Sequence, residues 1–94
     1  MQDGFFEWDD DKAERNPIDH DGVTFMEARS VFQSAPVEIY DEDHSEEEGR
    51  YAAMGFSPKG RLLFVVFTPR GKRIRIISAW PAGRNEEQIY EQNT

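Results

Sequence analysis

The chain has 94 residues, and its 19 aspartates and glutamates against 11 lysines and arginines give a formal net charge of −8. It contains no cysteine, which excludes disulfides and thiolate metal sites, and its longest apolar run, residues 62–67, is too short to cross a bilayer. Because the first residues lack the basic and apolar regions of a signal peptide, we expect one soluble cytoplasmic domain over residues 1–94, without membrane contact.

The start of the chain predicts a short strand and a helix. Residues 4–8 carry aromatic anchors and form the strand. Asp9 is a suitable helix N-cap, and the acids that follow it favour the positive end of a helix dipole. Pro17 disfavours helical backbone at the residue before it, so this helix is predicted to span residues 9–16.

A second helix follows a turn at residues 20–22, whose His-Asp-Gly sequence is typical of turns. Thr24 and Glu27 fit the S/T-x-x-E pattern of a capping box, in which each side chain accepts from a backbone N–H at the helix start. Apolar residues recur at helical spacing over residues 25–34, and Pro36 ends the helix.

The second half of the chain predicts strands joined by short turns. Pro-Lys-Gly and Pro-Arg-Gly sequences separate three apolar runs, which indicates an antiparallel meander, and the middle run is apolar on both faces. A solvated acidic loop at residues 41–49 precedes them, and Ile89 anchors a last helix. The predicted strands span residues 37–40, 50–57, 61–68 and 72–79, and the last helix spans residues 84–93.

Together these elements predict an α+β fold. A small antiparallel meander sheet of four to five strands would combine with two N-terminal helices and one C-terminal helix.

Charge is divided unequally between the two halves of the chain. Residues 1–50 hold 16 acids and 4 bases, whereas residues 51–94 hold 3 acids and 7 bases. Because cations supply most of the affinity for phosphates, any contact with nucleic acid is expected from the C-terminal half. The acidic half would suit a basic protein partner.

Arg73 and Arg75 are two residues apart in a predicted strand, so both guanidinium groups leave the same face of the sheet. A guanidinium fork matches phosphate oxygens, and Arg50, which begins a neighbouring strand, could converge with them. The alternative is an exposed strand face that keeps a sheet edge soluble, and the sequence does not separate the two interpretations.

Three further side chains have two interpretations each. His20 could carry a proton or contact a phosphate, or it could only fix the turn between the helices. Trp80 could stack on a base, although such a tryptophan more commonly packs against a helix end. His44 lies among acids, where a solvated loop is a simpler interpretation than a metal site. No nucleotide-binding or zinc-protease motif is present, so we predict neither a metal nor a cofactor.

The order of these motifs resembles the BrnT toxins. The stretch FEWDDDKAERN followed by DGVTFMEARSVF is similar to the opening of that family, which reads W-D-x-x-K-A-x-x-N and then H-G-V-x-F-x-E-A. GRLLFVVFT and RIRIISA continue the resemblance, which extends over residues 6–91. The matching positions are Trp8, Asp9, Lys12, Asn16, His20, Phe25, Glu27, Ala28, Arg50, Gly55, Phe67, Thr68, Ile76, Ile77, Ser78 and Ala79.

The resemblance implies a RelE-like fold and a ribonuclease toxin of a type II toxin–antitoxin pair, which stops translation by cleaving RNA without a metal or cofactor. Its partner would be a BrnA-like antitoxin with a ribbon-helix-helix domain, and operator DNA would be bound only through that antitoxin. The residues implied for catalysis are His20, Arg50, Arg75, Ser78 and Trp80, and those implied for RNA binding are Lys72, Arg73 and Arg84.

Two departures from the family pattern concern the expected site. Asp19 stands where the family usually has lysine, and Asp21 is inserted after His20. ISAWPA replaces ISAR-R-A, so Trp80 occupies the position of a catalytic-type arginine. A group that stabilises the negative charge developing at phosphorus raises the rate of cleavage by ~10²–10³-fold, and tryptophan cannot supply this stabilisation. The alternative function is therefore that of a catalytically inactive protein that binds an antitoxin and acts as a co-repressor.

Overall fold

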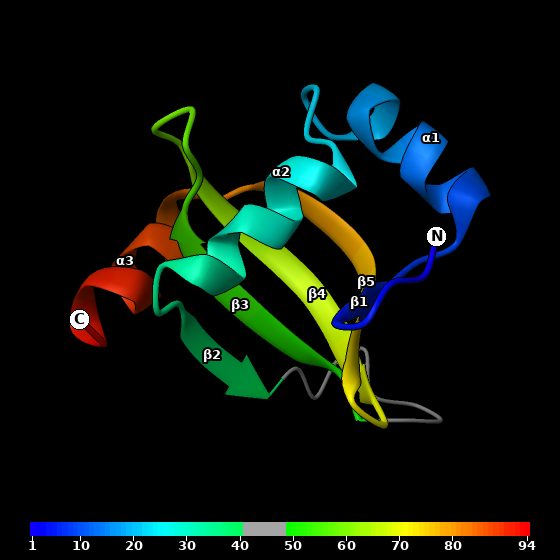
Figure 1. Cartoon of the computed structure of the whole chain (residues 1–94). Helices are drawn as coiled ribbons and strands as arrows, with labels where there is room; N and C mark the ends of the chain where they lie inside the picture. Colours follow the sequence, from blue (N-terminus) through cyan, green and yellow to red (C-terminus); the bar gives the residue numbers. More distant parts are fainter. Residues whose placement is uncertain (41–48) are drawn as a thin grey trace.

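A computed structural model describes residues 1–40 and 49–94 of the chain and confirms the predicted α+β fold (Figure 1). The acidic loop, including His44, lies outside the described residues except for Gly49. In chain order the elements are β1 (Phe6–Glu7), α1 (Asp10–Asp19), α2 (Phe25–Ser30), the 3₁₀ turn η1 (Val31–Gln33), β2 (Val37–Tyr40), β3 (Tyr51–Phe56), β4 (Leu62–Arg70), β5 (Arg73–Pro81) and α3 (Arg84–Gln92).

The five strands form one sheet in the order β1-β5-β4-β3-β2. Strands β2 to β5 make the predicted antiparallel meander. The short β1 instead pairs in parallel with β5, with Phe6 opposite Ile74 and Glu7 opposite Arg75, so the sheet is mixed. The local sequence of a two-residue strand carries no information about its direction, because the pairing is decided by a partner far along the chain.

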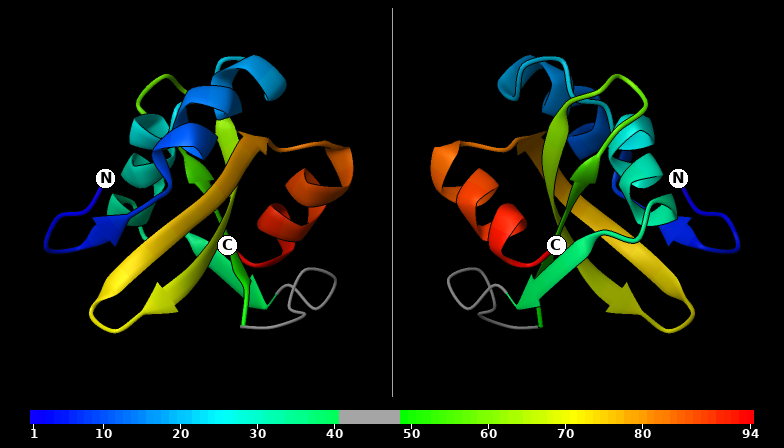
Figure 2. Two further views of the ribbon diagram at one scale, coloured as in Figure 1. Left: turned by 90° about the vertical axis from the view of Figure 1, so that its right-hand side faces the viewer. Right: turned by 90° about the vertical axis from the view of Figure 1, so that its left-hand side faces the viewer.

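The sheet separates two layers of apolar side chains. Along β4, Leu63, Val65 and Phe67 pack in the core beneath α1 and α2, whereas Phe64 and Val66 face the opposite side, where α3 lies. Figure 2 shows α1 and α2 on one side of the sheet and α3 on the other. The central strand is thus covered on both faces, as its continuous apolar run predicted.

The predicted end of the first helix is wrong, because α1 continues through Pro17. Proline lacks the N–H that would donate to the carbonyl four residues earlier, which costs a helix interior roughly 3 kcal/mol. In α1 this loss falls in the last turn, where the His20 N–H still donates to the Asn16 carbonyl at 2.9 Å. Asp21 and Gly22 then take positive φ values of 53° and 77°, which turn the chain toward α2.

The predicted capping box of α2 is only half formed. The Thr24 hydroxyl accepts from the Glu27 N–H at 3.0 Å, as expected. The Glu27 carboxylate turns away from the helix start and accepts from Arg61 Nε and Nη2 at 2.8 and 2.6 Å and from the Ser57 hydroxyl at 2.7 Å. The hydrogen bond from Arg61 lowers the pKa of this buried carboxyl below its ordinary value, against the opposing effect of burial. Glu27 therefore ties α2 to the turn between β3 and β4.

Two element boundaries differ from the prediction near the candidate site. Strand β1 is shorter than residues 4–8, and β5 extends past Ala79 to include Trp80 and Pro81. Ile89 is half-buried and shares the packing of α3 on the sheet with Tyr90. In the part of the chain that the structure describes, no helix is long and apolar enough to cross a membrane.

Candidate functional site

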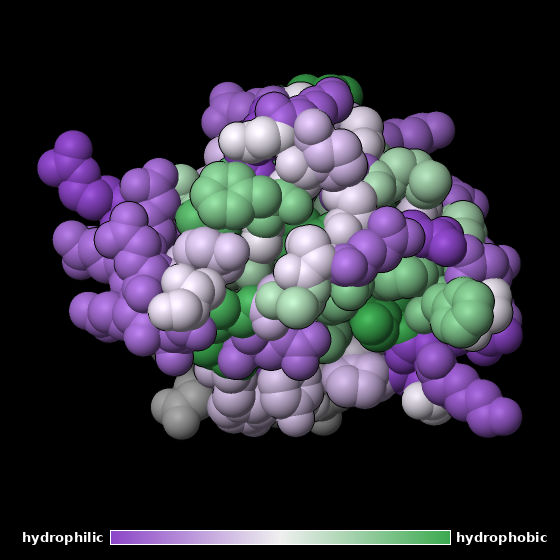
Figure 3. All heavy atoms as spheres, turned by 60° about the vertical axis from the view of Figure 1, so that its left-hand side comes forward, coloured by the Kyte–Doolittle hydropathy of each residue, from purple (hydrophilic) through white to green (hydrophobic). Residues whose placement is uncertain are grey.

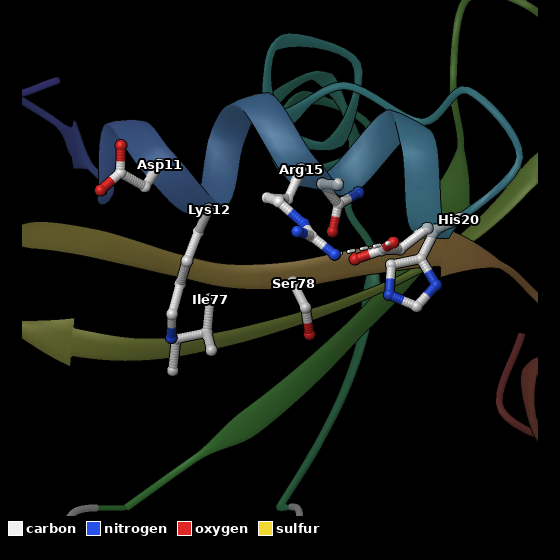
Figure 4. A pocket seen from close by; sticks show the side chains of 8 residues that line it. Asp11, Lys12, Arg15, His20, Ile77 and Ser78 are labelled. Carbon is white, nitrogen blue, oxygen red and sulfur yellow. Dashed lines mark ion pairs between the residues drawn. The ribbon is translucent and has the colours of Figure 1, made fainter.

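A pocket of about 410 Å³ lies between α1 and β5 (Figure 4). Its lining joins cationic, acidic and neutral polar side chains: Asp11, Lys12, Arg15, Asn16, Asp19, His20, Ile77 and Ser78. Figure 4 shows Lys12 extending from α1 toward Ile77, His20 at the other end of the helix, and Ser78 between them. Of the residues that the sequence nominated, His20 and Ser78 therefore share one pocket.

Helix α1 supplies the cations of this pocket. Lys12, Arg15 and Asp19 are three and four residues apart, which is the spacing of side chains on one helix face. Arg15 Nη2 lies 3.6 Å from Asp19 Oδ1, and both side chains are well exposed, so the pair is weak enough to exchange for another anion. Lys12 and Arg15 were not among the residues predicted for the site, although their helical spacing was a usable signal.

Asn16 attaches α1 to the edge of β5. Its Nδ2 donates to the carbonyls of Val23 and Ala79, both at 2.8 Å, and its Oδ1 accepts from the Ala79 N–H at 3.2 Å. Strand β1 covers the edge of β5 at Ile74 and Arg75 and does not reach Ala79. At Ala79 the Asn16 amide binds the backbone groups that a neighbouring strand would otherwise bind. The buried Asn16 thus fixes the distance between α1 and β5 along the pocket.

An irregularity in β5 decides which side chains enter the pocket. The pairing with β4 shifts between Val66, opposite Ser78, and Phe67, opposite Ile76, so that Ile77 is an extra residue. Ile76 and Ala79 consequently face the same core, three residues apart instead of two. Without this β-bulge, strict alternation would turn Ser78 toward the core and away from the pocket.

His20 and Trp80 are in ring contact at one end of the site. The ring centroids of His20 and Trp80 are 5.5 Å apart. Trp80 also stacks on Phe64 at 5.1 Å, and its Nε1 donates to Glu86 in α3 at 3.3 Å. Trp80 thus packs against the start of α3, in agreement with one of its two interpretations, and its indole joins the site to α3.

Arg75 lies near the other end of α1 with its guanidinium already paired. Its Nη1 donates to Glu7 Oε2 at 2.8 Å. Its charge also contributes to the lowered pKa of Asp9, for which the hydrogen bond from the Lys12 N–H is the largest cause. A phosphate that bound Arg75 would therefore compete with Glu7.

The other nominated cations lie outside this pocket. Arg73 Nε donates to the Asp3 carbonyl at 2.6 Å and so holds the start of the chain against β5. Lys72 lies in the exposed turn between β4 and β5, Arg84 is exposed at the first residue of α3, and Arg50 is half-buried directly before β3. None of these four residues lines the pocket, whose cations are Lys12 and Arg15 from α1, and the convergence of arginines stays a prediction.

The composition of the pocket suits a phosphodiester better than a metal ion. Two flexible cations can bind phosphate oxygens, an imidazole can move protons near neutral pH, and a hydroxyl can donate a hydrogen bond. Over residues 1–40 and 49–94, no three His, Asp or Glu side chains are grouped to hold a metal.

Comparison with known proteins agrees with this fold. The profile of the family described as "Ribonuclease toxin, BrnT, of type II toxin-antitoxin system" matches residues 8–86. The structure is similar to the 1.1 Å crystal structure of the Brucella abortus ribonuclease toxin BrnT, with a TM-score of 0.66 and 19% sequence identity, over 85% of this chain and 99% of that chain. A search of curated proteins gives no match. The crystal structure supports the fold, and the profile match, which covers most of the chain, confirms the predicted family: the chain belongs to the BrnT family of ribonuclease toxins of type II toxin–antitoxin systems.

Proposed function

We propose that the chain cleaves RNA in the pocket between α1 and β5 and thereby inhibits translation in the cytoplasm. The observation that carries this proposal is the convergence of His20, Ser78 and the α1 cations on one pocket in a member of a ribonuclease toxin family. Membership of a type II family implies an antitoxin partner, for which we propose a BrnA-like ribbon-helix-helix protein. Operator DNA would be contacted through that antitoxin.

The proposed reaction needs proton transfer and charge stabilisation, and no metal. The 2′-oxygen of the RNA attacks the adjacent phosphorus as His20 removes its proton, and the bond from phosphorus to the 5′-oxygen breaks. The 5′-oxygen takes a proton on leaving, and the cleaved strand ends in a 2′,3′-cyclic phosphate. Lys12 and Arg15 stabilise the negative charge at phosphorus, and the Ser78 hydroxyl donates to a phosphate oxygen.

Cleavage of a defined RNA in the presence of EDTA tests this proposal. We expect the chain to cut all-ribose RNA and to leave intact a substrate that lacks the 2′-hydroxyl at the cleavage position. His20→Ala should slow cleavage by about 10²-fold, because it removes the proton carrier. Lys12→Ala should also slow it, whereas Lys59→Ala, which removes a lysine from an exposed turn outside the pocket, should not. Equal cleavage by the His20 and Lys59 variants would contradict the assignment.

Trp80 favours a second candidate function, that of an inactive binding module. It stacks on Phe64 and is tied to α3, and it brings no charge to a position where the family usually has arginine. Trp80→Arg separates the two functions in the same RNA assay. Cleavage by the variant alone would assign the natural chain to antitoxin binding and co-repression. Absence of cleavage by both proteins would exclude the ribonuclease function.

A further inference from the structure

A second groove, of about 670 Å³, lies on the α3 side of the molecule, away from the α1–β5 pocket. It runs between α3, the end of β5 and the hairpin that joins β3 to β4. Its lining combines apolar residues, among them Phe56, Leu62 and Tyr90, with the charged Arg61, Glu87 and Glu91. The proposed RNA reaction uses none of these residues.

The aromatic part of this groove is accessible. Phe56 leaves 52% of its surface exposed and meets Tyr90 edge to face, with ring centroids 5.7 Å apart. Figure 3 shows hydrophobic side chains exposed between hydrophilic ones on the side of the molecule that comes forward in that view. Aromatic side chains with a polar rim are the usual composition of a protein–protein contact surface.

The sides of the groove are acidic. Glu87 and Glu91 are four residues apart on α3, so their carboxylates lie on one side of the helix. Among the residues that the structure describes, no cation is paired with either carboxylate. The lining cation, Arg61, is neutralised by the two-pronged contact with Glu27. The charge that a partner would meet here is therefore negative.

We infer that this groove is the docking surface for the antitoxin, which would place an apolar anchor against Phe56 and Tyr90 with lysine or arginine beside Glu87 and Glu91. The inference rests on the proposed antitoxin partner and adds where that partner binds and by what chemistry. The acidic rim repels RNA, because nucleic acids need cations at their phosphates. It also opposes a second copy of this chain, whose net charge is −8.

The test measures the dissociation constant of the proposed ribbon-helix-helix antitoxin, by titration calorimetry with the full-length protein. Phe56→Ser and Glu87→Lys should each weaken binding by about tenfold or more, because one removes the anchor contact and the other reverses the rim charge. Phe5→Ser and Glu14→Lys are matched controls, since they change an exposed phenylalanine and an exposed helix glutamate elsewhere, and should change binding less than about twofold.

Unchanged binding by both groove variants, or equal weakening by groove and control variants, would overturn the inference. So would a dimer of this chain in sedimentation that dissociates with Phe56→Ser, which would assign the groove to a second copy. RNA cleavage is assayed separately on the unmodified chain. Absence of cleavage would therefore count against the proposed reaction and leave the comparison of dissociation constants intact.

Discussion

At the scale of single residues, one buried amide does most to define the site. Asn16 binds both backbone groups of Ala79, and its own backbone carbonyl accepts from the His20 N–H. Ser78 and Trp80 flank Ala79 in β5. Asn16 therefore holds these strand residues through its side chain and His20 through its backbone carbonyl. Asn16 is therefore a positioning residue, which acts on the pocket through its neighbours.

Asn16→Ala should lower the free energy of unfolding by roughly 2–4 kcal/mol, because buried backbone groups of Ala79 lose their partners at about 1–3 kcal/mol each. Urea unfolding followed by circular dichroism measures the change. Asn85→Ala, at an exposed position in α3, is the control and should stay within about 0.5 kcal/mol. A similar loss of stability in both variants would show that the hydrogen bonds of Asn16 do not hold α1 to β5.

At the scale of elements, α1 and β5 position the residues of the site by two different local features, a helix N-cap in α1 and a β-bulge in β5. Helix α1 starts at Asp9, whose carboxylate accepts from the Lys12 N–H at 3.0 Å, and so presents its cationic face from the first turn. Strand β5 contributes the bulge that turns Ser78 toward the pocket. The cap is visible in the sequence, whereas the bulge depends on how β5 pairs with β4.

Removal of the α1 cap should destabilise the protein without abolishing the fold. Asp9→Ala is expected to lower the free energy of unfolding, because an N–H in the first turn loses its acceptor. Asp9→Asn keeps a capping oxygen and should cost less than half as much. Thermal unfolding of the two variants beside the natural chain makes the comparison, and equal losses would indicate that charge, not capping, is the contribution of Asp9.

Sequence patterns predicted these elements to different degrees. The meander and the N-caps Asp9 and Thr24 follow from residues close together in the chain and were predicted correctly, whereas the capping-box role of Glu27 was not. Pro17 was misjudged because its cost depends on position within the helix and on the hydrogen bonds that follow it. Lys12 and Arg15 were overlooked because helical spacing shows a shared face and does not show what that face meets.

At the scale of the whole molecule, the excess of acids makes stability depend on how individual carboxylates are held. Glu27 joins α2 to the turn between β3 and β4 through Arg61, and Asp3 fixes the first residues through the N–H groups of Phe5 and Phe6, which lower its pKa to about 2. Both carboxyls bind protons more weakly in the folded chain than in the unfolded chain. Their stabilisation is therefore complete at neutral pH and declines in acid.

The pH dependence of unfolding isolates the part that Glu27 contributes. Because its folded pKa lies below the ordinary 4.5, its stabilisation is present above that pH and is lost as the pH falls through the folded pKa. Glu27→Gln should cost roughly 2 kcal/mol at pH 7, since Arg61 loses its charged partner but stays partly exposed, and less at pH 3, which lies below the ordinary pKa of the carboxyl. Urea titrations at the two pH values give both numbers. The same cost at both would contradict this account.

The sequence by itself determined the family, the α+β class and the kinds of side chain available for chemistry at His20 and Ser78. These features follow from the types and spacings of residues within short stretches of the chain, because such patterns act on the local backbone structure. Only the tertiary structure decided that β1 runs parallel to β5, that Arg75 is paired with Glu7, and that the pocket forms beside α1. The deciding contacts join residues 63 to 68 positions apart, and such pairings arise only when the sheet and α1 assemble.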